Sequence, residues 1–336
     1  MRFSFASILI STSLVACSGG DSSPDAPSLS GDKYSLTFGP VTVQPGQENT
    51  QCIQTRLSNT TPIKVHDMHN VLSPGSHHLI VYRDNKTTAE TTTPVNCQPF
   101  TGALNPTGTV APIMITQRSD DPLYMPEGVA YTMAANQMIR IEMHFINSTD
   151  APLQITATVD LFAAEESTIH DEADLLFIGS PDVDIPAGGT VTLDQFFTPS
   201  RAQLDITQAK FFAITGHTHK FGTKMEVDLA PTTGGERTSI YSPDPFQWAE
   251  PATVTHSPEF QVPSGMGGFH FKCEYHNTSN QHVQFGESAN DEMCFFWAYY
   301  YPSQGSHVCF HSNQFGNADV CCPDAGPQLC NQISNI

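Results

Sequence analysis

Proline and glycine recur so often along this chain that long helices are disfavoured over most of its length. Its 336 residues include 25 prolines and 23 glycines, which interrupt helices and favour turns. Between them lie short runs rich in β-branched and aromatic residues, as is typical of strands. The clearest runs are residues 34–43, 79–83, 138–147, 153–162, 211–214, 224–229 and 294–301. Short strands at close spacing predict an all-β fold built from antiparallel β-sandwiches.

The length of the chain and the distribution of its polar residues predict two β domains. A chain of 336 residues is too long for one ordinary core. The stretch 163–174 is acidic and carries few apolar side chains, so we expect the boundary there. The predicted domains cover residues 32–165 and 175–308, and residues 309–336 form a predicted cysteine-rich tail.

The N-terminus has the features of an export signal. A positively charged start precedes a mostly apolar stretch over residues 3–15, which is too short to span a membrane. A Leu-Val-Ala-Cys sequence ending at Cys17 resembles a bacterial lipobox, so residues 1–17 predict a lipoprotein signal peptide with Cys17 lipidated; a plain signal peptide is the alternative. Residues 18–31 would be a flexible tether. We therefore expect an exported bacterial lipoprotein at the outer membrane or cell surface, held to the membrane only by its N-terminal lipid.

Composition limits the partners of this chain and agrees with export. It has 34 acidic and 14 basic residues and a net charge of −20 at pH 7, which disfavours binding to nucleic acid. Nine cysteines less Cys17 leave eight, an even number consistent with four disulfides in an oxidising compartment. Half of these eight lie close to the C-terminus, where a zinc site is a weaker alternative because their spacing does not suit tetrahedral binding. They are Cys309, Cys321, Cys322 and Cys330.

Three groups of histidines are candidate metal ligands. His217 and His219 follow an apolar run, and residues two apart on a strand point to one face. The adjacent His77 and His78 could bind one metal only at a strand end or a bulge, and a turn does precede them. Neutral imidazole suits copper, zinc, iron and nickel. With 14 histidines such a pair also arises by chance, and a lone strand histidine such as His144 is more often solvated.

Met293 adds a candidate ligand of a different kind. It lies beside an apolar strand, where methionine usually fills the core. As a ligand it would add a soft thioether to two imidazoles, a combination that favours Cu(I) over zinc. His66 and His69 lie just before the first histidine pair and are candidates for supporting or alternative ligands, although loop histidines are commonly solvated.

The order of these residues along the chain resembles that of the copper type II ascorbate-dependent monooxygenases, a family that includes peptidylglycine α-hydroxylating monooxygenase and dopamine β-monooxygenase. The most specific match is Asp291-Glu292-Met293-Cys294, which leads into Tyr299-Tyr300. The matching segments are residues 76–82, 142–145, 216–222 and 286–300. The resemblance spans roughly residues 35–303, which is nearly the whole mature chain.

The resemblance implies a fold, two copper ions and an activity. The fold is two antiparallel β-sandwich domains of jelly-roll type, with the coppers facing each other across an open, solvent-filled cleft. One copper supplies an electron, and the other binds O2 and cleaves the substrate C–H bond. The implied ligands are His77, His78 and His144 for the first copper and His217, His219 and Met293 for the second. The implied enzyme hydroxylates a small organic substrate with O2 and an external reductant such as ascorbate.

The same resemblance implies two disulfides, Cys52–Cys97 and Cys273–Cys294. The second would support the strand that presents Met293.

The chain departs from the peptide-amidating members at four positions. Thr215 replaces an arginine that helps to bind the substrate carboxylate, and Phe295 and Trp297 replace polar pocket residues. A glycine-extended peptide is therefore not the expected substrate, and the aromatic residues suggest a less polar one unless they belong to the core. Glu142 replaces a glutamine near the first copper.

Two other functions compete with the monooxygenase. The first is a surface copper-binding or copper-sensing lipoprotein that has the ligands but no turnover. The second is a structural or adhesive β-sandwich whose histidines are accidental.

Overall fold

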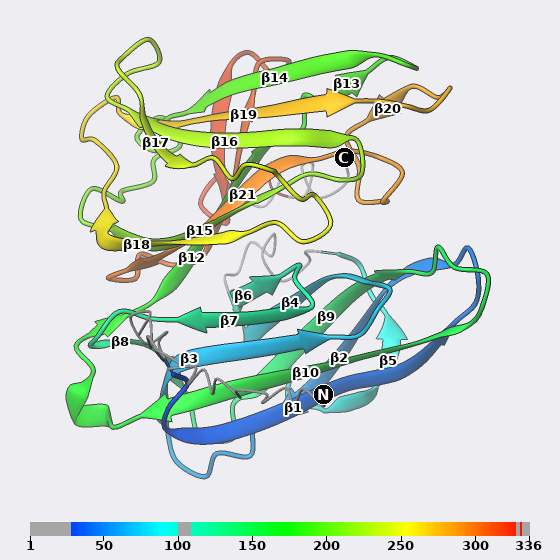
Figure 1. The fold of residues 1–336 in the computed structure, drawn as a ribbon. Coiled ribbons are helices and arrows are strands. Elements are labelled where there is room, and N and C mark those ends of the chain that lie inside the picture. The colour runs from blue at the N-terminus through cyan, green and yellow to red at the C-terminus, as the bar shows by residue number, and fades with distance from the viewer. Residues whose placement is uncertain (1–27, 100–108, 327–329, 331–336) are drawn as a thin grey trace, which may run out of the picture.

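A computed structural model describes residues 28–99, 109–326 and 330, and Figure 1 shows its arrangement. The predicted signal peptide, the lipidation site Cys17 and most of the tether lie outside the described residues. Apart from the 3-10 helix η1 (Glu166–Thr168), the named elements are all strands. Most strand pairs are antiparallel, which confirms the predicted all-β class.

The first eleven strands form two sheets that pack face to face, here called the N-terminal half. One sheet runs in the order β1 (Asp32–Val43), β10 (Leu153–Ala164), β3 (Ile63–Leu72), β8 (Val129–Met133) and β11 (Asp171–Glu172), and β7 (Asp120–Tyr124) also pairs with β3. The other runs in the order β5 (Thr91–Asn96), β2 (Glu48–Arg56), β9 (Met138–Ile146), β4 (Ser76–Asp84) and β6 (Val110–Thr116). Apolar residues of both sheets meet in one core.

The remaining strands form the C-terminal half. Its larger sheet runs in the order β18 (Thr253–Phe260), β15 (Lys210–His217), β21 (Cys294–Tyr301), β12 (Asp174–Ser180), β22 (His307–Ser312) and β23 (Ala318–Cys322). A second sheet contains β14 (Thr190–Phe197), β19 (Gly268–His276), β16 (Gly222–Ala230) and β17 (Thr238–Tyr241), and β13 (Asp184–Ile185) pairs with β20 (Val283–Gln284). The predicted domain bounds and the jelly-roll connectivity stay predictions.

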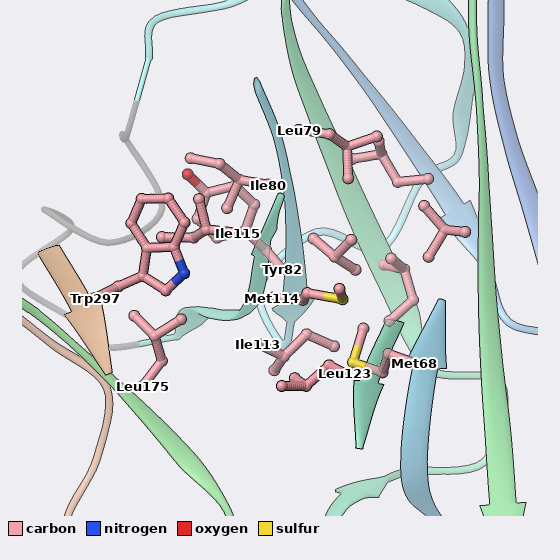
Figure 2. Close-up of a cluster of buried hydrophobic side chains, with 14 of the residues drawn as sticks. Met68, Leu79, Ile80, Tyr82, Ile113, Met114, Ile115, Leu123, Leu175 and Trp297 are labelled. Atoms are coloured by element: carbon pink, nitrogen blue, oxygen red, sulfur yellow. The ribbon is translucent and has the colours of Figure 1, made fainter. Parts of the chain in front are cut away.

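Strand β21 is buried on both faces because it lies between two cores. Its odd-numbered side chains from Phe295 to Tyr301 join the core of the N-terminal half, and its even-numbered side chains from Cys294 to Tyr300 join the core of the C-terminal half. Side chains alternate across a strand, so an unbroken apolar run is what a doubly covered strand requires. Figure 2 shows Trp297 and Leu175 beside Ile115 of the N-terminal half. The two halves therefore meet through an apolar interface.

The described cysteines form four disulfides, and two of them are those implied by the family resemblance. Cys52 bonds to Cys97 and Cys273 bonds to Cys294. The other two bridges, Cys309–Cys321 and Cys322–Cys330, were not predicted as pairs. Because all four C-terminal cysteines are oxidised in pairs, none is available to bind zinc. Four disulfides indicate an oxidising compartment, as expected for an exported protein.

The C-terminal segment is more regular than its sequence suggested. Strand β22 pairs in parallel with β12, and β23 continues the sheet beyond it. Residues assigned to a tail from position 309 onward thus extend the larger sheet as far as Cys322. Among the described residues, no helix has the length and apolar character needed to cross a membrane.

Candidate metal centre

His77, His78 and His144 converge on one point at the edge of the N-terminal half. His78 and His144 are directly opposed in the β4–β9 ladder, and the register shifts between Ser76 and His78. This irregularity at the start of β4 lets the adjacent residues His77 and His78 point to the same side of the strand, which a shared metal requires. One ligand nitrogen from each of the three histidines lies within 4.8 Å of the others.

The chemical state of these rings suits a metal ion. Burial lowers the pKa of His77 and of His78 well below the usual value, so both rings are neutral. Their Nδ1 atoms lie 3.2 Å apart, and Nε2 of His77 is buried without a hydrogen-bond partner among the described residues. Neutral imidazoles that offer unprotonated nitrogens are the form that binds copper or zinc.

Glu48 fixes the third ring of this group. Its Oε1 lies 2.9 Å from Nε2 of His144, and since a carboxylate only accepts, Nε2 donates and Nδ1 is left for a metal. The hydrogen bond from His144 lowers the pKa of Glu48 to about 2. The same carboxylate accepts bonds from the Ala289 amide (2.7 Å) and the Ser288 hydroxyl (3.1 Å) of the C-terminal half. Glu48 therefore joins a candidate ligand to the loop that precedes Met293.

His217 and His219 form the second pair, with ring centroids 5.1 Å apart. His217 ends β15, and His219 lies in the turn that follows, which is closed by a bond from the Gly222 amide to the His219 carbonyl. Burial lowers the pKa of His217 well below its usual value and that of His219 to about 4. Nδ1 of His219 donates to the carbonyl of Asp291 at 3.1 Å, which leaves Nε2 for a metal.

Met293 is brought to this turn by the buried carboxylate of Glu292. That carboxylate accepts bonds from the amides of His219 (2.8 Å), Phe221 (2.6 Å) and Met293 itself (3.3 Å). The Tyr275 hydroxyl also donates to the Met293 carbonyl at 2.7 Å. These bonds place the Met293 backbone beside the His219 turn, and the role of its sulfur as a ligand stays a prediction.

The two histidine groups form a single buried cluster, so the expected open, solvent-filled cleft is wrong for this structure. The His77 ring centroid lies 5.2 Å from that of His219 and 6.0 Å from that of His217. All five histidines are buried, with at most 7% of their surface exposed. The cluster is closed because the apolar face of the larger C-terminal sheet packs on the N-terminal half.

A small cavity lies beside the cluster. It is lined by His78, Ile115, Gln117, Phe177, His217 and Trp297. Its volume of about 10 Å³ is enough for roughly one water-sized molecule. Trp297 and Phe295 are both part of the core between the halves, which is the alternative that their sequence position left open, and Trp297 also lines the cavity.

The other residues singled out in the sequence lie outside the cluster. The Thr215 hydroxyl bonds to that of Thr253 at 2.8 Å. Glu142 is fully buried and accepts bonds from Arg140 (2.9 Å) and Tyr82 (3.1 Å). The two alternative ligand candidates have other partners. His66 lies 3.0 Å from the Val129 carbonyl, and His69 lies 2.7 Å from Asp120.

Sequence reasoning missed Glu48 and Gln117, whose side chains bond to the imidazole rings of candidate ligands. Oε1 of Gln117 lies 2.7 Å from Nδ1 of His217, and its Nε2 donates to the Trp248 carbonyl at 2.9 Å. Neither residue belongs to a motif, and each lies about a hundred positions from its histidine, so no local pattern could have shown the pairing.

We expect Glu48→Gln to weaken metal binding by His77, His78 and His144. Glutamine keeps an oxygen acceptor but lacks the negative charge, so it polarises the Nε2–H of His144 less and makes the ring a weaker ligand; such outer partners are worth roughly 10- to 100-fold in metal affinity. Titration with a competing copper chelator would measure the change. Glu90→Gln is the matched control, because Glu90 is an exposed carboxylate of the same half that bonds to Arg56. Equal affinities for the Glu48 variant and the wild type would show that Glu48 does not support the site.

We expect Asp121 to make the stability of the protein depend on pH. Burial raises its pKa to about 6, against a bond from the Thr116 hydroxyl that lowers it. Because the folded pKa lies above the unfolded one, its contribution is fully present below pH ~4 and is lost as the pH rises through about 6. The Asp121→Asn side chain cannot ionise. Between pH 4 and 7, the free energy of unfolding in urea should therefore fall by up to ~3 kcal/mol less in this variant than in the wild type. Asp150→Asn, at an exposed site, should keep the wild-type slope; identical slopes for all three proteins would refute the assignment.

Comparison with known proteins shows what the C-terminal half is similar to. Residues 172–319 match the family model of the copper type II ascorbate-dependent monooxygenase C-terminal domain, a range that contains His217, His219 and Met293. No curated protein matches the chain. Similar solved structures include the major capsid protein P2 from bacteriophage PM2 (8% identity, 82% of this chain and 100% of that chain, TM-score 0.35). Another is the Sulfolobus Turreted Icosahedral Virus structure (9% identity, 79% and 59%, TM-score 0.23).

TM-scores this low support no inference about this chain from the viral structures. The match of residues 172–319 confirms the resemblance that the order of histidines and methionine predicted: this part of the chain is similar to the C-terminal domain of the copper type II ascorbate-dependent monooxygenases.

Proposed function

We propose that this chain is a two-copper monooxygenase that hydroxylates a C–H bond of a small organic substrate with O2 and an external, ascorbate-type reductant. The observation that carries the proposal is the cluster of five buried histidines, three from one half and two from the other. The family match supports copper monooxygenase chemistry in general. In this proposal His77, His78 and His144 hold one copper, and His217, His219 and Met293 hold the other.

The donor set fits copper. Nδ1 of His219 donates to a backbone carbonyl, and Nε2 of His144 donates to Glu48, so each ring offers its other nitrogen. When bound, the two ions would supply the electrons that reduce O2 as the C–H bond is hydroxylated, with one oxygen atom entering the product and the other leaving as water. Burial lowers the pKa values of His77, His78, His217 and His219, which favours the neutral rings that bind copper.

The residues that line the cavity support a proposal for the kind of substrate. Ile115, Phe177 and Trp297 line it, and none of its lining residues is Asp, Glu, Lys or Arg. An anionic substrate would meet no opposite charge there, since Thr215 stands where peptide-amidating relatives have an arginine. We therefore propose a small, weakly polar substrate. Such a substrate is larger than the cavity of about 10 Å³, so the halves would part to admit it.

Copper content and oxygen transfer test the function. We expect two coppers per wild-type chain after reconstitution, and one each in His217→Ala/His219→Ala and in His77→Ala/His78→Ala. With a reductant and labelled O2, the wild type should put one labelled oxygen atom into product from a panel of weakly polar compounds, and Met293→Ile should not.

The outcomes of this experiment separate the proposal from its alternative. One copper or none in the wild type would rule out the paired-copper mechanism. Two coppers without oxygen consumption that depends on the reductant would favour a copper-binding lipoprotein without turnover, which the small size of the cavity also suits.

We also propose that residues 1–17 are a lipoprotein signal and that a lipid on Cys17 holds the protein at the bacterial outer membrane or cell surface. The first domain would cover residues 32–165, and the second would begin at residue 175 and extend past the predicted bound of 308 to include β23, which ends at Cys322. The four disulfides support export. Cys17→Ser should abolish labelling by a radioactive fatty acid and release the protein from membranes. Persistent labelling of this variant would exclude Cys17 as the anchor, and Ser18→Ala is the matched control.

A further inference from the structure

We propose that Gln117 is a positioning residue that sets which nitrogen of His217 faces the metal and ties that ligand to the opposite half of the molecule. Gln117 belongs to the N-terminal half, directly after β6, whereas His217 ends β15 of the C-terminal half. The role of His217 as a copper ligand rests on the proposed function. The hydrogen bonds of Gln117 do not depend on that function.

The orientation of the Gln117 carboxamide follows from its second partner. The Trp248 carbonyl lies 2.9 Å from one end of the amide, and because a carbonyl only accepts, that end must be the NH2 group. The amide oxygen then faces Nδ1 of His217 at 2.7 Å. An oxygen acceptor requires a donor opposite, so Nδ1 of His217 carries its hydrogen. Nε2 is left with its lone pair, as in His219.

The backbone that carries Gln117 is held from both sides. Toward the N-terminal half, the Thr116 hydroxyl donates to Asp121 at 2.8 Å and accepts from Asn70 at 3.1 Å. Toward the C-terminal half, the Ile115 amide donates to the Tyr299 hydroxyl at 3.1 Å. Gln117 itself is 4% exposed. A side chain on such a fixed backbone can define the orientation of the ring it contacts.

Gln117 also holds a second segment over the cluster. Trp248 lies in the connection between β17 and β18, and its ring centroid is 6.4 Å from that of His77. The Gln117 amide therefore bonds both to His217, a candidate ligand of one copper, and to the backbone of Trp248. The Trp248 ring lies beside His77, a candidate ligand of the other copper. Separation of the halves would break the bond from His217 to Gln117, so the hydrogen-bonding state of His217 would report whether the halves are closed.

The orientation of His217 can be measured in the full chain without metal. Long-range 1H–15N correlation spectra distinguish the two neutral forms of an imidazole, and the His217 signals are assigned by their loss in His217→Ala. We expect the Nδ1–H form in the wild type, the same form in Gln117→Glu, which keeps an oxygen toward His217, and a mixture of both forms in Gln117→Leu. Gln137→Leu is the control, because Gln137 is equally buried but bonds only within the N-terminal half.

Copper retention provides the second readout. In a His77→Ala/His78→Ala background, Gln117→Leu should weaken copper binding at the remaining site by roughly 10- to 100-fold, and Gln137→Leu should not. An unchanged Nδ1–H form and unchanged affinity in Gln117→Leu would overturn the proposal. Because the spectra require neither copper nor oxygen, a protein without turnover that still shows the predicted change would refute the proposed function and leave this inference standing.

Discussion

The packing of β21 between two cores is the constraint on which the candidate site depends. Phe295, Trp297 and Tyr299 face the N-terminal half, and each would expose a large aromatic surface if the halves separated. Burial of one such side chain contributes roughly 1.5–3 kcal/mol. Met293 precedes this strand, and His217 lies opposite Phe295 on the neighbouring strand. The contact that hides the aromatic face therefore also brings the histidines of the C-terminal half to those of the N-terminal half.

Burial of five imidazoles in one cluster fixes their chemistry. Burial and mutual repulsion lower the pKa values of His77, His78, His217 and His219, so these four rings are neutral. Each hydrogen bond from a ring to an oxygen then determines which nitrogen remains available. Glu48, Gln117 and the Asp291 carbonyl have this role for three of the rings. Two of these three bonded groups also connect the halves, so ligand orientation and closure depend on the same contacts.

Much of the fold and the identity of the candidate ligands could be predicted from sequence, because both leave local signals. Runs of β-branched and aromatic residues mark strands, and the turn before His77 and His78 allowed them to share one side. The disulfides Cys52–Cys97 and Cys273–Cys294 followed from the family resemblance. The supporting residues could not be found in this way. Glu48 is 96 residues from His144, and Gln117 is 100 residues from His217, so only the tertiary structure pairs them.

The closed interface was the other feature that local sequence could not show. The unbroken apolar run of β21 predicts that both faces of this strand are buried. It does not predict that one face packs against the N-terminal half of the same chain. An open cleft was therefore expected where the structure has a cavity of about 10 Å³. In this structure the histidines are buried and close together, which suits electron transfer over a short distance, but the cavity beside them has no room for an organic substrate. A hydroxylase with this fold would alternate between a state in which the halves are apart and admit substrate and a state in which they are together and align the ligands. The bonds of Glu48 and Gln117 across the interface distinguish the two states, because they can form only when the halves are together.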